Sequence, residues 1–383
     1  MHEDIRVSRV LFEAPALDSQ ERDVIATIDE LRQTLRHFVA EPRRWTGLLR
    51  RVAFARAIRG SNSIEGFHVS MDDALAATDR EEPLDSDRES WVAVNGYRSA
   101  MTYILQLAGE QEFTYSVELI RSLHFMMQEY DLGMRPGRWR MGEIFVMDET
   151  TGATVYTGPP AEAVPSLMDA LTDELNDGDG HVLVRAGLAH LNLVMIHPFR
   201  DGNGRMGRAL QTLVLAREGI LAPPFSSIEE YLGANQQDYY DELARVGQGR
   251  WDPPGDTRPW IRFTLRCHLH QAQTILTRAR ESESVWSMLE ELVARHGLPE
   301  RSMIALYDAA FGFKVRNPLY RGEAEIAEYS AGRDLRSMVE RGLLVPVGEK
   351  RGRYYVAAEP VAEIRRRAAQ TRPTFEDPFE SPI

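Results

Sequence analysis

Cysteine is almost missing from this sequence, since Cys267 is the only one among 383 residues. An internal disulfide is therefore excluded, and a reducing compartment such as the cytoplasm is expected. No apolar run approaches the length of about 18 residues that a membrane span needs, so we expect no membrane partner. The N-terminal stretch is too charged for a signal peptide.

Positive charge is also in short supply. The sequence has 45 Lys and Arg against 58 Asp and Glu, a formal net charge of −13. This balance argues against a surface that binds nucleic acid over its whole extent, although a local basic patch remains compatible with it. The hydrophobic fraction of 43% is ordinary for a globular protein, and the length allows two or three domains.

Helical periodicity dominates the chain and predicts a mainly α fold. Apolar residues recur at helical spacing in seven long stretches, 21–39, 43–66, 86–109, 116–130, 163–177, 181–196 and 257–282. The stretch 137–160 differs, because it alternates roughly, contains a Thr-Gly pair and stops at Pro159-Pro160. This pattern predicts a β-hairpin.

The composition changes near Ser284. Three short helical patterns, 284–297, 299–312 and 331–344, precede two apolar runs around a Gly-Lys-Arg-Gly turn. This order predicts a small winged-helix-like domain with 331–344 in the place of the recognition helix. Residues 284–357 carry eleven Lys or Arg and ten Asp or Glu, a weak balance for a DNA reader, but the wing 350–353 is basic. DNA contact and protein docking both stay open for this domain.

The most informative stretch is HPFRDGNGRMGR, from His197 to Arg208, which follows the apolar run 181–196. Pro198 cannot continue a helix normally, so the chain must turn there. Glycines at the start of the next helix let backbone N–H groups approach an anion, and the helix dipole favours negative charge. Arg205 and Arg208 lie three residues apart on one helix face, where both can bind phosphate oxygens.

Two further side chains of this stretch suit chemistry on a nucleotide. Asp201 is an oxygen ligand fit for Mg²⁺ on a polyphosphate. His197 is the group whose ordinary pKa suits a general base near neutral pH. A lone His-Pro or Gly-x-Gly is usually structural, but here nine specified positions fall in twelve. At roughly one in twenty per position, chance is negligible.

This stretch resembles the signature of the Fic family of nucleotidyl transferases, His-Pro-Phe-x-Asp/Asn-Gly-Asn-Gly-Arg-x-x-Arg, at every fixed position. The other segments that resemble family features are Leu123-His124, 137–140, 156–168 and 231–243. The resemblance covers about residues 40–280. It implies a Fic-type helical bundle with a β-hairpin flap, to which the winged-helix-like domain is added.

The resemblance also implies a reaction, the transfer of AMP from ATP to a Ser, Thr or Tyr hydroxyl of a target protein or of the chain itself. His197 would remove the hydroxyl proton, and Asp201 would hold Mg²⁺. The flap residues Val155, Tyr156 and Thr157 would pin the target by strand addition. The nucleotide would be bound by Gly202, Asn203, Gly204, Arg205, Met206, Gly207, Arg208, Tyr239 and Tyr240.

The segment SNSIEG, Ser61 to Gly66, is similar to the inhibitory motif of the family, Ser/Thr-x-x-x-Glu-Gly/Asn. The carboxylate of Glu65 would pair with Arg208 and fill the space that a γ-phosphate needs. The plainer interpretation, a helix end with Gly66 as its cap, is compatible with this one.

These features divide the chain into four regions: an N-terminal helical region with the inhibitory motif (1–110), the Fic core (111–282), the winged-helix-like domain (283–360) and a tail (361–383) whose end is predicted to be disordered. Several alternatives stay open. The reaction could run in reverse, with Glu65 activating water for AMP removal. Another nucleotide or phosphate group could be transferred, because Gly247 stands where some relatives place an Asn. The chain could act as a DNA-binding regulator, and it could form a homodimer.

Overall fold

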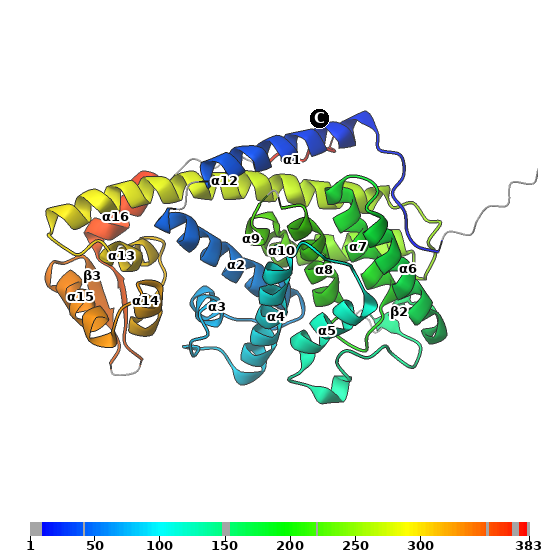
Figure 1. Cartoon of the computed structure of the whole chain (residues 1–383), viewed down its shortest axis with the longest axis horizontal. Coiled ribbons are helices and arrows are strands. Elements are labelled where there is room, and N and C mark those ends of the chain that lie inside the picture. Colours follow the sequence, from blue (N-terminus) through cyan, green and yellow to red (C-terminus); the bar gives the residue numbers. More distant parts are fainter. Residues whose placement is uncertain are drawn as a thin grey trace, which may run out of the picture.

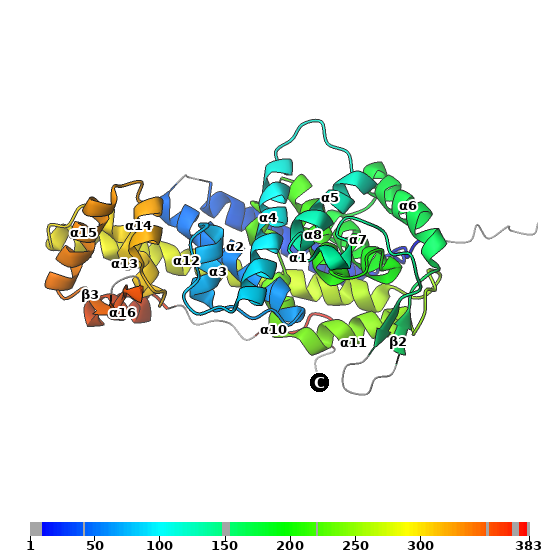
Figure 2. The same cartoon turned by 90° about the horizontal axis from the view of Figure 1, so that it is seen from below.

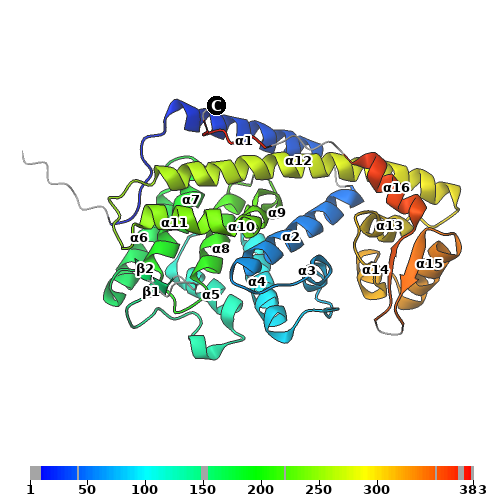
Figure 3. The ribbon, with the colours of Figure 1, turned by 180° about the vertical axis from the view of Figure 1, so that it is seen from behind.

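The computed structural model describes residues 10–40, 43–147, 154–219, 221–349, 352–369 and 375–380. The fold is mainly helical, as predicted. Helix α12 (Arg258–Arg295) has 38 residues, a length of about 57 Å. It runs along one side of the molecule with α1 (Ser19–Phe38) beside it (Figures 1 and 3). Among the described residues, no helix is long and apolar enough to cross a membrane.

The other helices that precede α12 in the chain form a bundle beneath it, with α7 (Val182–Ile196) and α8 (Asn203–Arg217) at the centre of that bundle (Figure 1). Helix α7 is apolar on most faces, and a helix of this kind is stable only when it is surrounded. The neighbours are α2 (Arg44–Ile64), α3 (Met71–Thr78), α4 (Arg88–Leu107), α5 (Val117–Gln128), α6 (Val164–Asp177), α9 (Pro223–Ser226), α10 (Glu229–Ala234) and α11 (Gln236–Gly247), with 3-10 turns at Leu132–Met134 and Ala161–Ala163.

Close approach of α7 and α8 depends on Gly207. A Cβ atom at this position would lie 2.7 Å from the His190 ring and 2.8 Å from the Val194 side chain. Any larger residue would push the two helices apart. The turn between these helices, which carries the 197–208 stretch, is therefore held on a tightly packed base.

The predicted hairpin is present. Strand β1 (Phe145–Met147) pairs antiparallel with β2 (Thr154–Thr157), with Val146 opposite Tyr156. It lies at the end of the molecule away from the C-terminal helices, beside α11 (Figure 2). The Thr-Gly pair of the predicted turn falls within 148–153, outside the described residues.

The C-terminal module contains α13 (Ser302–Ala310), α14 (Asn317–Glu323), α15 (Glu328–Glu340), the antiparallel pair β3 (Leu344–Val347) and β4 (Tyr354–Ala357), and α16 (Glu359–Ala368). Three helices precede the hairpin and a fourth follows it, but the first three are not all the predicted ones. The stretch 284–297 is the end of α12, and α14 takes the remaining place. The boundary predicted at 282/283 falls inside α12, because that stretch is polar but contains no Gly or Pro to end a helix. The winged-helix assignment itself stays a prediction.

The end of the tail was predicted to be disordered, but residues 375–380 pack against the rest of the protein. Helix α16 reaches Ala368, and residues 375–380 pack on the core through Phe375 and Phe379. An ion pair of 2.7 Å joins Asp377 to Arg266 of α12. Periodicity could not reveal this segment, because its contacts are single aromatic and charged anchors rather than a regular face.

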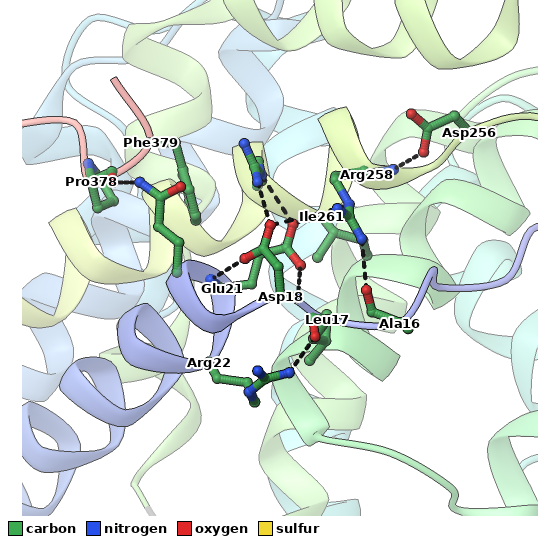
Figure 4. Close-up of polar contacts among 12 residues, drawn as sticks. Ala16, Leu17, Asp18, Glu21, Arg22, Asp256, Arg258, Ile261, Pro378 and Phe379 are labelled. Atoms are coloured by element: carbon green, nitrogen blue, oxygen red, sulfur yellow. Dashed lines mark hydrogen bonds and ion pairs between the residues drawn. The ribbon is translucent and has the colours of Figure 1, made fainter. Parts of the chain in front are cut away.

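Nearby, the N-terminus of α1 is fastened to α12 (Figure 4). Asp18 and Glu21 form a capping box, in which each side chain accepts the other's backbone N–H at 2.9 Å. The same two carboxylates accept hydrogen bonds from Arg262, at 2.6 and 3.0 Å. The tail meets this cluster where Gln20 donates to the carbonyl of Pro378 at 2.6 Å.

Candidate active site

The turn between α7 and α8 places His197 at the end of a helix. His197 has a left-handed backbone (φ 53°), and its N–H donates to Leu193 at 2.9 Å, which closes α7. The turn is then locked by Asn203, whose side-chain oxygen accepts from Phe199 N–H at 2.9 Å while its amide donates to Phe199 C=O at 3.0 Å. Asn203 was predicted to bind nucleotide, but both ends of its side chain hold the loop.

The imidazole of His197 has one nitrogen committed to the protein. Nδ1 lies 3.3 Å from the carbonyl oxygen of Val194, and a carbonyl can only accept, so Nδ1 carries the proton. Nε2 is therefore the nitrogen that can accept a proton. Burial lowers the pKa of His197 to about 4, so this ring is neutral at pH 7. The position and the protonation state both suit a general base.

The N-terminus of α8 offers backbone N–H groups to a ligand. Its first helical bond runs from Met206 N–H to Gly202 C=O at 3.0 Å. The N–H groups of residues 203–205 precede that bond and point out of the helix end. A Cβ atom at Gly204 would lie 2.5 Å from the Glu65 carboxylate, so Glu65 sits directly over this anion-binding helix end.

Glu65 also meets Arg208, as the inhibitory motif predicted. Nη2 of Arg208 donates to Oε1 of Glu65 at 2.7 Å, in a contact with one carboxylate oxygen. Ser61 accepts two more hydrogen bonds from Arg208, one at its hydroxyl (2.8 Å) and one at its carbonyl (3.0 Å). Nη1 of Arg208 is buried with no hydrogen-bond partner in the described ranges. Burial alone would lower the pKa of Arg208, but the charge of Glu65, two neighbouring tyrosines and the hydrogen bond to Glu65 together raise it.

Arg205 and Asp201 lie at the other side of the helix end. The Arg205 side chain is buried, contacts the Tyr130 hydroxyl at 3.3 Å and lies over the ring of Phe67 at 5.2 Å. The Asp201 side chain is 45% exposed, with Oδ2 at 3.8 Å from Arg205 Nη2. An exposed carboxylate beside an anion-binding helix end is the kind of ligand that Mg²⁺ uses together with nucleotide phosphates.

Four other residues predicted to bind the nucleotide differ in how accessible they are. Met206 is fully buried in the core, and Gly207 is covered by α7. Tyr239 is buried too, with its hydroxyl 2.9 Å from Nε2 of His190 and its ring 5.9 Å from the guanidinium of Arg208. Tyr240 is exposed and donates to the carbonyl of Ile64 at 3.2 Å, next to the inhibitory Glu65. Of these residues, Tyr240 has the side chain that a bound nucleotide could reach.

The flap residues differ among themselves. Tyr156 points into the core, where its hydroxyl donates to the carbonyl of Met195 at 2.7 Å. The main chain of Thr157 is already paired, with its N–H on Gly249 at 2.9 Å and its carbonyl on Trp251 N–H at 3.0 Å. Val155 is exposed. Strand addition at Thr157 would have to displace these bonds, so Val155 is the member of the trio that is accessible to a target.

Two side chains outside the motif hold the turn and had no predicted role. Arg140 donates to the carbonyl of His197 at 2.8 Å and also to the carbonyl of Pro159 after the flap. It therefore ties the base to the flap. His124 stacks on Phe199 and contacts the carbonyl of Asp201. Both belong to segments that resemble the family, but a lone Arg and a lone His give no signal of these contacts.

Fold and site together define a helical domain that presents a neutral histidine, His197, beside the N-terminus of α8. Residues 114–215 match the Fic/DOC family. The chain is 30% identical over 258 residues to a protein adenylyltransferase Fic of Nematostella vectensis, covering 66% of this chain and 56% of that one. It is 25% identical over 285 residues to one of Aedes aegypti, covering 73% and 51%. The chain thus spans about half the length of these curated relatives.

Solved structures share the fold. A Fic family protein of Desulfovibrio desulfuricans G20 aligns with 91% of this chain and 99% of its own, with a TM-score of 0.59 and 22% identity. Fic-1 of C. elegans aligns with 67% of this chain and 72% of its own, with a TM-score of 0.54 and 22% identity. Residues 114–215 of the chain are therefore identified as a Fic/DOC domain.

Proposed function

We propose that this protein transfers AMP from ATP to a hydroxyl side chain of a target protein, and that Glu65 restrains the reaction. The observation that carries the proposal is the position of His197, neutral and with Nε2 available, next to the open N-terminus of α8. The names of the curated relatives, protein adenylyltransferase Fic, support the same activity.

The proposed chemistry follows from this geometry. Nε2 of His197 accepts the proton of the target hydroxyl as its oxygen forms a bond to the α-phosphorus of ATP. The bond from that phosphorus to the bridging oxygen breaks, and pyrophosphate leaves. The N–H groups of residues 203–205 receive phosphate oxygens, as helix N-termini do. Arg205 and Arg208 supply positive charge to the same phosphates.

Asp201 is the residue that would hold Mg²⁺, because its carboxylate is exposed at the same helix end. When bound, Mg²⁺ would neutralise phosphate charge and orient the leaving group. Mg²⁺ commonly binds through one or two carboxylates plus phosphates and waters, so one protein ligand is sufficient.

Glu65 would act as a competitor of the γ-phosphate. Its carboxylate already accepts from Arg208 and lies over Gly204, so it occupies the place and the donors that a phosphate requires. A nucleotide triphosphate can bind fully only after this carboxylate moves. The apo arrangement is therefore proposed to be the inhibited one.

The position of the radioactive label in ATP tests this function. The full chain and its Glu65→Gly variant are incubated with a cell extract and with ATP labelled at either the α- or the γ-phosphate. AMP transfer predicts that the protein-bound label lost in a His197→Ala, Glu65→Gly double variant comes from α-labelled ATP only. Label from γ-labelled ATP that is also lost in this double variant would indicate phosphoryl transfer by this protein and would refute the proposal.

A further inference from the structure

Helix α5 supplies two buried side chains that contact Asp201, and neither belongs to the 197–208 stretch. His124 and Gln128 lie one helical turn apart, and each is 1% exposed. The imidazole of His124 is stacked on the ring of Phe199, with centroids 3.6 Å apart and planes inclined by 3°. The turn that carries Asp201 therefore rests on α5.

The two side chains hold both the main chain and the carboxylate of Asp201. Gly137 N–H donates to Nδ1 of His124 at 2.9 Å, so the proton is on Nε2, which donates to the Asp201 carbonyl at 2.9 Å. The side-chain amide of Gln128 donates to Oδ2 of Asp201. Oδ1 is thereby left for a ligand.

We propose that His124 and Gln128 are positioning residues for the cation-binding carboxylate of Asp201. This inference rests on the proposed function, since it assigns the groups that aim a ligand of Mg²⁺. Partners that orient a metal ligand commonly change metal affinity by about 10- to 100-fold when they are removed. Gln128 acts on the carboxylate, and His124 acts on the loop that bears it.

Metal binding tests this role without relying on turnover. Mn²⁺ serves as the probe, and its binding to the protein with α,β-methylene-ATP is followed by electron paramagnetic resonance in the Glu65→Gly background. Gln128→Leu should weaken Mn²⁺ binding about tenfold or more. His124→Phe, which keeps the stacking but loses the hydrogen bond, should weaken it as well. Met127→Leu, on the same helix but facing the core, is the control and should change nothing.

The results distinguish the positioning role of His124 and Gln128 from the metal role of Asp201. Wild-type affinity for Mn²⁺ in both α5 variants would overturn the positioning role. If the background protein adds no Mn²⁺ binding to that of the nucleotide analogue alone, the metal role of Asp201 fails instead. Circular dichroism melting shows whether each variant is folded, and the two variants change different contacts, so one remains informative if the other unfolds.

A separate observation concerns α2, the helix that ends at Glu65, because it is shared between two hydrophobic cores. Its N-terminal part, including Trp45 and Leu48, packs in the core of the C-terminal module. Its C-terminal part, including Ile58 and Ile64, packs in the core that contains α7 and α8. Figure 1 shows α2 between the two bodies. The helix is therefore a mechanical link from the module to the inhibitory glutamate.

The link is fixed to the module by Arg51, which lies in the N-terminal half of α2. Its guanidinium donates to both carboxylate oxygens of Asp308 on α13, each at 2.7 Å. It also donates to Asp79 at 3.0 Å and lies 3.7 Å from Glu323 on α14. Arg51 is buried, and burial raises the pKa of both Asp79 and Glu323. One buried cation is thus shared by three carboxylates from three elements.

Two further hydrogen bonds join the C-terminal module to the chain that follows Glu65. Lys314 N–H of the module donates to the carboxylate of Asp72 on α3 at 2.7 Å. Arg316 donates to the carbonyl of Glu82 at 2.8 Å. Val315 between them is bonded to Tyr355 of β4 in both directions, at 2.9 and 2.8 Å. The module thereby grips the chain on both sides of the inhibitory motif.

We infer that the C-terminal module braces the inhibitory helix, so that a change in its docking on Arg51 alters the restraint by Glu65. Fourteen residues of helix separate Arg51 from Glu65, a lever of about 21 Å. A small tilt of this lever is enough to break a contact of 2.7 Å between Glu65 and Arg208. The inference rests on the proposed function and adds a place from which it is regulated.

The test weakens the brace and measures AMP transfer. Asp308→Asn keeps the shape of the side chain but removes its charge, and transfer from α-labelled ATP should rise about fivefold or more, the lower end of typical coupling between sites. The matched control is Asp334→Asn, because buried Asp334 pairs with Arg301 at 2.6 Å within the module and does not contact α2. This control should not activate the enzyme.

Combining the brace variant with Glu65→Gly shows whether the effect passes through Glu65. The double variant should match Glu65→Gly alone. Equal gains in Asp308→Asn and Asp334→Asn, or no gain in Asp308→Asn, would overturn the brace while an active Glu65→Gly leaves the proposed function intact. No labelling in any variant would overturn the proposed function itself. If Asp308→Asn fails to fold, Arg316→Met is used in its place. It removes the hydrogen bond from Arg316 to the carbonyl of Glu82 and should raise AMP transfer in the same way.

Discussion

Replacing Glu65 with glycine should increase AMP transfer, which is the opposite of what most substitutions in an active site do. The structure supplies the magnitude. The Arg208–Glu65 hydrogen bond is 2.7 Å long, with Arg208 1% exposed and Glu65 22% exposed. A charge-assisted bond of this kind contributes about 1.5–3 kcal/mol. Because about 1.4 kcal/mol corresponds to a factor of ten, its removal should accelerate the reaction by about 10- to 150-fold.

Two further variants isolate the cause. Glu65→Gln keeps the size and can still accept a hydrogen bond from Arg208, but it lacks the charge, so its activity should be intermediate. Arg208→Ala removes the partner of Glu65 and a phosphate contact together, so it should not be activated. The double variant of Glu65 and Arg208 should then resemble Arg208→Ala alone.

The assay is the initial rate of label transfer from α-labelled ATP at subsaturating nucleotide, for the same protein concentration and the same acceptor. Equal or lower activity in Glu65→Gly would refute the restraint. A variant that gains no transfer but loses AMP removal from a modified target would point to the reverse reaction, with Glu65 as its base.

The remaining predictions concern protons and stability. His197→Ala should lower the transfer rate by about 10²–10⁴-fold without loss of nucleotide binding measured by fluorescence; a wild-type rate would exclude it as the base. Burial lowers the pKa of His190 and His268 to about 3 and that of His124 to about 4. The unfolded chain therefore binds more protons below its own histidine pKa of about 6.5, so the stability is complete above that pH and is lost as the pH falls. The melting temperature should drop between pH 6.5 and 5, and a flat profile would contradict these protonation states. Glu65→Gly without nucleotide should melt roughly 2–4 °C lower than the wild type and should gain more from added ATP; equal gains would contradict the shared site.

The elements near the site were the most predictable, since α7 is an unbroken apolar run and the hairpin has turn residues at its end. The C-terminal boundary was not predictable in the same way. The change of composition near Ser284 predicted a domain boundary and a separate short helix, yet α12 continues through this stretch to Arg295. A polar composition indicates exposure to solvent. The end of a helix is instead signalled by Gly, Pro or capping residues. A long helix exposed on one side therefore mimics a domain boundary.

In the active site, the motif identified the residues but not the division of labour among them. The side chains of Asn203 and Tyr239, both predicted to bind the nucleotide, make buried hydrogen bonds within the protein, and the nucleotide contacts themselves stay a prediction. Ser61 was only a letter of the inhibitory motif, and it accepts two hydrogen bonds from Arg208. These roles depend on which helices pack against each other in the core. The spacing of residues within one segment does not predict such contacts.

The burial of Arg208 gives a physical reason for the proposed inhibition by Glu65 of the same chain. A guanidinium that is 1% exposed is costly unless charges or dipoles compensate it, and the cost is several kcal/mol when it is left alone. With ATP bound, the γ-phosphate would supply that compensation. Without ATP, Ser61 supplies dipoles and Glu65 supplies the charge. Glu65 thus has the geometry of a substitute for the phosphate, so the proposed inhibition and the stabilisation of the site without ATP would both follow from one hydrogen bond. A protein that loses Glu65 should therefore become faster and less stable together, and ATP should restore the second property.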